Sequence, residues 1–80
     1  MWERAPLVAA IEAEKIRLGE RLRALRLERG LTQATAAELA GLHAVQVARM
    51  ESGAANPTIA TVVAMARAFD VALSALFTAE

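Results

Sequence analysis

Residues 33–53, QATAAELAGLHAVQVARMESG, contain the pattern that decides the fold of this chain. Residues 33–40 are rich in helix formers, and Gly41 can supply the left-handed residue that ends a helix. Residues 43–51 then form a second short helix. Ala37 allows two helix axes to cross closely, and Gly41 suits a tight turn between them. The stretch therefore predicts a helix, a turn and a second helix.

The apolar residues of this stretch fall on one side of the two predicted helices. We expect a buried seam that contains Ala36, Ala40, Leu42, Val47 and Met50. The outer face of the second helix is then left with Ala44, Val45, Gln46 and Arg49. A short helix presented in this way has a shape that fits the major groove of DNA.

The composition predicts one small all-α domain. Eighty residues suffice for a single core, and 56% of them are hydrophobic, with alanine, a strong helix former, supplying much of that share. The absence of cysteine excludes disulfides and thiolate metal sites. The apolar run near the start is too short for a signal peptide or a membrane span. We therefore expect a cytoplasmic protein with no membrane partner.

The flanking sequence predicts further helices on both sides. Residues 18–29 place three leucines at inward helical spacing, and Thr32 and Thr58 are suited to cap the helices that follow them. A helix over 58–69 and a closing helix over 73–77 complete the bundle. We expect the closing helix to turn three residues inward, namely Leu73, Leu76 and Phe77.

The N-terminal residues allow two interpretations. Residues 7–15 are able to form a helix after Pro6, and it either lies on the bundle or continues into the next helix. The alternative is an arm for dimerisation or regulation, in which Trp2 would be the most useful anchor.

Four segments carry a resemblance to a known family: LGERLRALRLERGLTQ (18–33), AGL (40–42), MESGAANPT (50–58) and LSALF (73–77). From about Leu18 to Phe77, their order and spacing resemble the phage-repressor and Cro-like helix-turn-helix proteins of the Xre family. The resemblance implies a five-helix lambda-repressor/Cro-like DNA-binding domain over residues 17–80. Residues 1–16 then form an N-terminal extension that can add a helix.

The resemblance also implies roles for individual residues. Thr32 and Gln33 would contact DNA at the start of the second helix, with the Gln33 side chain on a phosphate. The positions that would face base edges are Ala44, Val45, Gln46 and Arg49. Among these, Arg49 can donate to guanine, Gln46 can pair with adenine or reach a phosphate, and the methyl groups suit thymine.

A further pair of residues matches the family in a structural role. Arg26 on the first helix and Glu51 at the end of the second short helix would form an ion pair. The resemblance implies that this pair ties the reading helix to the rest of the domain.

The chain departs from the family pattern at several positions. His43 stands where the family usually has a serine or threonine cap, and Thr35 replaces a common glutamate. The exit turn has Ser52, Ala54 and Ala55 in place of basic residues, which leaves backbone N–H groups to bind phosphate.

The charge distribution compensates only in part for these departures. The net charge of zero weighs against a nucleic-acid binder, but residues 17–53 carry a small basic excess. It arises because six arginines, at 17, 21, 23, 26, 29 and 49, face four glutamates, at 20, 28, 38 and 51.

The sequence thus predicts a transcriptional regulator, a repressor, that binds double-stranded DNA as a homodimer and needs no metal or cofactor. One short helix reads few base pairs, so two half-sites are expected. The predicted dimer interface contains Leu73, Leu76 and Phe77, with Ile59 or the N-terminal arm. The alternative is a protein-interaction module of the same fold, an antitoxin or adaptor, whose partner is a protein. The sequence contains no catalytic constellation that would predict an enzyme.

Overall fold

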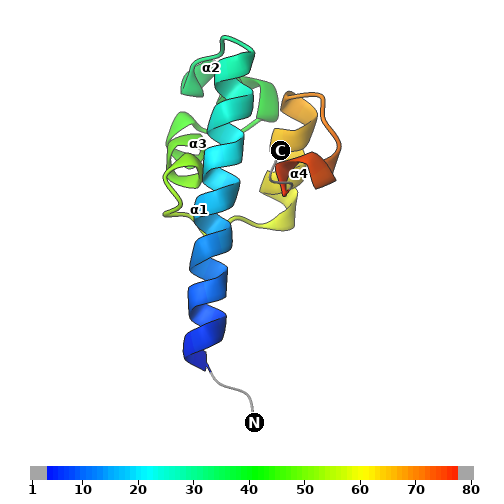
Figure 1. Cartoon of the computed structure of the whole chain (residues 1–80). Helices are drawn as coiled ribbons and strands as arrows, with labels where there is room; N and C mark the ends of the chain where they lie inside the picture. Colours follow the sequence, from blue (N-terminus) through cyan, green and yellow to red (C-terminus); the bar gives the residue numbers. More distant parts are fainter. Residues whose placement is uncertain (1–3, 78–80) are drawn as a thin grey trace.

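The computed structural model describes residues 4–77, which form α-helices and one 3-10 turn and contain no β-strand (Figure 1). In chain order the elements are α1 (Arg4–Glu28), α2 (Gln33–Ala40), α3 (Ala44–Glu51), α4 (Ile59–Ala68) and the 3-10 turn η1 (Leu73–Leu76). The predicted all-α class is confirmed, although the predicted fifth helix is only the single turn η1. Trp2, the predicted anchor, lies outside the described residues.

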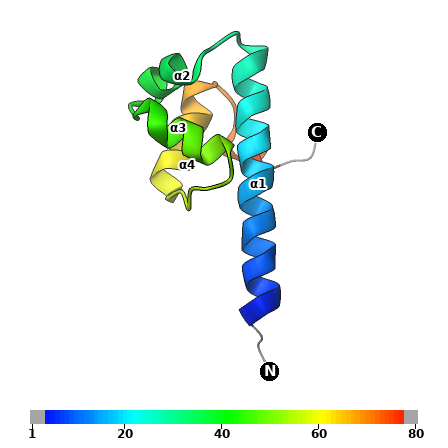
Figure 2. The same cartoon turned by 90° about the vertical axis from the view of Figure 1, so that its left-hand side faces the viewer.

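Helix α1 is one continuous helix of 25 residues. Its C-terminal half lies against the rest of the domain, whereas its N-terminal half projects away from it (Figures 1 and 2). Of the two arrangements that the sequence allowed for residues 7–15, the continuation into the next helix is the one found, because no proline interrupts the segment from Leu7 onward. The boundary predicted between residues 16 and 17 therefore falls inside a helix.

The core lies between the C-terminal half of α1 and the three shorter helices. Leucines at 18, 22 and 25 reach into it from α1, and α2 contributes only the small residues Ala36 and Ala37. Because alanine side chains are small, α2 packs closely against both α3 and α4. The largest side chains that are fully buried are Phe69, Leu22, Met65, Leu76 and Val47.

All the α-helices within residues 4–77 end in the same hydrogen-bond pattern. At the end of α2, the N–H of Gly41 donates to the carbonyl of Glu38, and the N–H of Leu42 donates to that of Ala37. Gly41 has a φ of 71°, the left-handed conformation that this motif needs and that glycine adopts without strain. The same pair of bonds follows α1, α3 and α4, with the left-handed residue at Gly30, Gly53 and Asp70.

The predicted N-terminal caps are confirmed for two helices. The hydroxyl of Thr32 accepts a hydrogen bond from the N–H of Thr35 at 3.0 Å, and that of Thr58 accepts one from Thr61 at 3.2 Å. Each bond satisfies one of the N–H groups that a helix leaves free in its first turn. Both ends of α2 are therefore fixed by local interactions.

The C-terminal turn η1 corrects part of the prediction. Leu76 is only 1% exposed and belongs to the core, but Leu73 and Phe77 are 39% and 50% exposed rather than turned inward. A single 3-10 turn buries one side only, and Arg21 holds it there by donating to the carbonyl of Ala75 at 2.9 Å. Leu76 is therefore buried within the chain and exposes little surface for the dimer interface in which the sequence predicted it.

Gly19 marks a close approach between α1 and α3. A Cβ atom built at this position would lie 2.5 Å from the carbonyl oxygens of Met50 and Glu51, at the end of α3. Only a residue without a side chain allows this approach, and the sequence prediction had assigned Gly19 no role. A glycine among inward-facing leucines was the signal that could have indicated a helix crossing.

We predict that Gly19→Ala destabilises the protein. In an exposed helix this change stabilises by up to about 1 kcal/mol, because alanine is the better helix former. Here the added methyl group meets backbone that cannot move aside easily, so we expect a loss of roughly 1–3 kcal/mol in the free energy of unfolding. Urea unfolding of both proteins gives this difference. A variant more stable than the wild type would show that α1 and α3 do not cross here.

Candidate nucleic-acid interface

Helix α3 rests on α1 and α2 and turns one face outward. Val47 and Met50 fix its inner face, at 0% and 4% exposure, and Ala36 packs in the same core. On the outer face Val45 is 63% exposed, and Ala44 and Arg49 are exposed as well. The three residues lie on neighbouring turns of one helix face, which is the arrangement that the sequence predicted.

The start of α3 is capped by Gln46 rather than by His43. The backbone of His43 takes the extended conformation of a cap residue, but the bond comes from Gln46, whose Oε1 accepts the His43 N–H at 2.8 Å. This reverse bond is half of a capping box and makes up for the poor capping ability of imidazole. Because the amide oxygen of Gln46 is used in this bond, mainly the amide N–H groups of Gln46 remain available for the predicted contact with DNA.

Glu51, the last residue of α3, joins three parts of the chain. Its Oε2 accepts from Arg26 Nε at 2.6 Å, and its Oε1 accepts from Arg26 Nη2 at 3.0 Å and from Gln33 Nε2 at 3.1 Å. The third nitrogen of Arg26, Nη1, donates to the carbonyl of Leu31 at 2.9 Å. We call these residues, Arg26, Gln33 and Glu51, the Glu51 network. It connects the end of α1, the start of α2 and the end of α3.

The Glu51 network is shielded from water. The side chains of Arg26 and Glu51 are only 11% and 4% exposed. The hydrogen bond from Glu51 raises the pKa of the Arg26 guanidinium above its ordinary value, although burial opposes this. The predicted ion pair therefore exists as a bidentate contact in which each charge is neutralised by the other.

Thr32 and Gln33 lie at the start of α2, where the sequence predicted contacts with phosphate. Thr32 is exposed, and its hydroxyl is used as the cap. Gln33 is partly buried, and one N–H of its amide is directed to Glu51. A side-chain amide has a second N–H, so a phosphate contact remains compatible with the Glu51 network.

Arg49 borders a hollow between α3 and the start of α4. The hollow has a volume of about 210 Å³ and is also lined by Gln46, Asn56, Thr58 and Thr61. Among residues 4–77, no carboxylate lies within ion-pair distance of the Arg49 guanidinium. An exposed and unpaired cation beside four polar side chains is well suited to an anionic or hydrogen-bonding partner. Sequence reasoning had not placed Thr58 and Thr61 at this site, because their distance along the chain hides their proximity.

The exit turn after α3 does not offer the backbone donors that the sequence predicted. The N–H groups of residues 52–55 are all bonded within the turn, to the carbonyls of Ala48, Arg49 and Met50. They are required to end the helix and are therefore not free for phosphate. This expectation from the sequence is wrong, because none of these four N–H groups is free.

Comparison with known proteins identifies the family. A family model described as HTH_3, helix-turn-helix, matches residues 22–76. The chain therefore belongs to this helix-turn-helix family, the Xre type of DNA-binding transcription regulators, as its sequence resemblance implied. Among curated proteins, no sequence matches this chain.

Solved structures of similar fold include three regulators. The restriction-modification controller protein C.AhdI from Aeromonas hydrophila is 37% identical with a TM-score of 0.79, over 81% of this chain and 98% of that one. An HTH_3 family transcriptional regulator from Vibrio cholerae is 31% identical with a TM-score of 0.80, over 84% of this chain but only 38% of its own. A hypothetical transcription factor, NHTF, from Neisseria is 26% identical with a TM-score of 0.78, over 81% and 75%.

Residues 4–77 lack two further features. No helix there has both the length and the hydropathy needed to cross a membrane. No cluster of three or more histidine, aspartate or glutamate side chains is placed to hold a metal ion.

We predict that Glu51→Ala strongly destabilises the fold. The change leaves the Arg26 guanidinium shielded from water without its counter-charge, which costs roughly 3–5 kcal/mol in buried pairs. Gln33→Ala removes only one hydrogen bond from the same carboxylate, so about 1 kcal/mol is expected. Thermal and urea unfolding of both variants gives the comparison. Equal stability of the Glu51→Ala variant and the wild type would mean that the pair does not hold α3 in place.

Proposed function

We propose that this protein is a sequence-specific DNA-binding regulator of transcription, acting as a repressor in the cytoplasm, and that it binds double-stranded DNA as a homodimer. The observation that carries the proposal is the outer face of α3, where Val45 and the unpaired Arg49 are exposed. The ion pair between Arg26 and Glu51 holds the end of this helix against α1. Family membership and the similarity to three regulators support the same function. The family is one of regulatory DNA-binding proteins, which supports a function other than catalysis.

In the proposed complex, α3 lies in the major groove. Arg49 donates to O6 and N7 of a guanine, while Ala44 and Val45 contact thymine methyl groups. The amide N–H groups of Gln46 reach an adenine or a phosphate. Gln33 donates its second N–H to a phosphate, and Thr32 lies beside it at the start of α2.

The proposed homodimer follows from the small size of the reading surface. One eight-residue helix contacts few base pairs, and two half-sites about 34 Å apart bring affinity into the usual range for specific binding. The exposed Leu73 and Phe77, together with Ile59, remain available to the dimer, whereas Leu76 does not. The low net charge makes the second half-site more important, because non-specific attraction to phosphates is weak.

The rival function is a protein-interaction module of the same fold, an antitoxin or adaptor that contacts a protein through α3. The large exposure of Val45 beside Ala44 is the observation that favours it, since an apolar tip suits a protein surface. The two functions differ in how α3 residues affect DNA binding.

We expect Arg49→Ala to relax the preference at one base pair in each half-site. The loss of a bidentate contact corresponds to roughly 1–3 kcal/mol of discrimination at that base pair. Gln33→Ala should instead weaken binding to all sequences about equally, because phosphates carry no sequence information. Binding of both variants to a pool of randomised duplexes measures the contrast.

Two results would contradict the proposed function. The first is a wild-type protein with no sequence preference in that pool. The second is a uniform loss of affinity in both variants, since α3 would then not read bases. Either result would favour the protein-interaction module.

A further inference from the structure

The projecting half of α1 carries an apolar stripe that nothing covers. In the domain, Leu18, Leu22 and Leu25 face the core at helical spacing, and stepping back by the same spacing leads to Ile11 and Leu7. These two residues lie on the same side of the helix as the core leucines but are 43% and 42% exposed. The face that packs the domain therefore continues about three turns beyond Leu18, along the part of α1 that projects from the domain (Figure 2).

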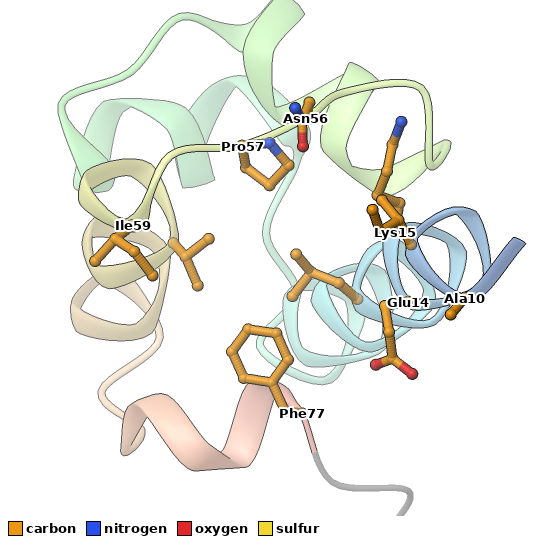
Figure 3. A pocket seen from close by; sticks show the side chains of 10 residues that line it. Ala10, Glu14, Lys15, Asn56, Pro57, Ile59 and Phe77 are labelled. Carbon is orange, nitrogen blue, oxygen red and sulfur yellow. The ribbon is translucent and has the colours of Figure 1, made fainter. Parts of the chain in front are cut away.

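A groove opens at the base of this projecting segment. It has a volume of about 330 Å³ and lies between α1, the start of α4 and the end of η1. In Figure 3, Ile59 of α4 and Phe77 at the end of η1 lie on the other side of it from Ala10, Glu14 and Lys15 of α1. Ile59 is 72% exposed and Phe77 is 50% exposed. The groove thus presents apolar surface directly beside the uncovered stripe.

We propose that residues 4–15 form a dimerisation arm, and that each arm occupies the groove of a second copy of this chain. Twelve residues of helix extend roughly 18 Å. Two α1 helices that pack antiparallel therefore bring the tip of each arm, with Leu7 and Val8, to the base of the other. The inference specifies the contact surface of the homodimer in the proposed function and rests on it.

A second copy fits this surface because the stripe and the groove belong to one chain and lie side by side. A two-fold dimer requires a surface that is complementary to itself, and an apolar helix next to an apolar groove satisfies this requirement. Leu7, Val8, Ile11, Ile59 and Phe77 together expose on the order of 450 Å². That is more than half of the about 800 Å² per partner in a standard specific interface, and a polar rim can supply the remainder.

The charges of the arm favour an apolar protein partner over an anionic surface. Lys15 donates to Glu12 at 2.9 Å, and Arg17 lies 3.4 Å from Glu14, so the cations near the groove are paired within their own helix. A helix that binds anionic lipid or a nucleic acid through this face would instead present unpaired basic residues. These pairs leave the border of the groove without a free cation, whereas Arg4, at the far end of the arm, forms no ion pair within residues 4–77.

The arm extends beyond what the helix-turn-helix family shares. The family match begins at residue 22, and the alignment with C.AhdI covers 98% of that protein but only 81% of this chain.

The groove is also lined by Asn56 and Pro57, which belong as well to the hollow beside Arg49. An arm bound in the groove would therefore touch the segment that connects the reading helix α3 to α4.

Sedimentation of the full chain without DNA tests the interface. We expect a wild-type dimer whose dissociation constant rises about 30-fold or more in Ile11→Glu and in Ile59→Glu, because each change buries an unpaired charge. Leu27→Glu is the matched control, since Leu27 is 54% exposed on the opposite face of α1. It should leave the dissociation constant unchanged. Circular dichroism checks that all variants retain the helical fold.

Disulfide cross-linking tests the exchange of arms directly. The chain has no cysteine, so single cysteines can be introduced without a background. An oxidised mixture of Leu7→Cys and Ile59→Cys should form a disulfide-linked heterodimer. A mixture of Leu27→Cys and Ile59→Cys should form it at least about ten times more slowly, because that position points away from the groove.

Three results would overturn the inference. A wild-type chain that stays monomeric at high concentration would do so, as would a dimer that Ile11→Glu leaves intact. The third is a Leu7→Cys variant that forms a disulfide with Ile59→Cys no faster than the Leu27→Cys variant does. Because these measurements contain no DNA, they can fail while the randomised duplexes still show sequence preference, and the reverse also holds.

Discussion

The bidentate ion pair between Arg26 and Glu51 is the interaction on which the position of α3 depends. Glu51 is the last residue of α3, and its carboxylate is held by α1 through Arg26 and by α2 through Gln33. Since both charges are shielded from water, loss of either partner leaves the other in an unfavourable environment. The arrangement also requires Gly19, because the carbonyls of Met50 and Glu51 occupy the space of a side chain there. A polar contact and a missing side chain thus fix one end of α3 against α1.

This dependence reflects how little stability α3 has by itself. Eight residues form a helix that is marginal in water, and its cap residue is a histidine that makes no side-chain capping bond. Gln46 caps the first turn, the bonded exit turn closes the last one, and Val47 and Met50 anchor the inner face. The exposed residues of α3 therefore lie on a helix that is fixed at both ends and along its buried face. In the proposed DNA complex a rigid presentation would matter, because a chain without net charge would rely on shape and a few specific contacts for most of its discrimination between sequences.

The apolar stripe of α1 serves two purposes in the proposed assembly. Its C-terminal leucines form the core of the protomer, whereas Leu7 and Ile11 remain uncovered above a groove in the same molecule. One helix face would then build both the domain and the dimer. In that case the distance between the two reading helices is set by a helix that also carries Arg26, so that dimerisation and the position of α3 share one rigid element.

The sequence by itself determined most of the features that depend on neighbouring residues, although the bond between Gln46 and His43 and the bonded N–H groups of the exit turn were not foreseen. The bounds of α2, the left-handed turn at Gly41, the caps at Thr32 and Thr58 and the inner seam of α3 all follow from local spacing and backbone preference. The pairing of Arg26 with Glu51 was available only through the resemblance to a family, because 25 residues separate them. Tertiary structure alone decided the close approach at Gly19, the burial of Leu76 without Leu73 and Phe77, and the course of residues 7–15 away from the bundle. The physical reason is that periodicity shows which residues are apolar on a face, but only packed neighbours decide whether that face is covered.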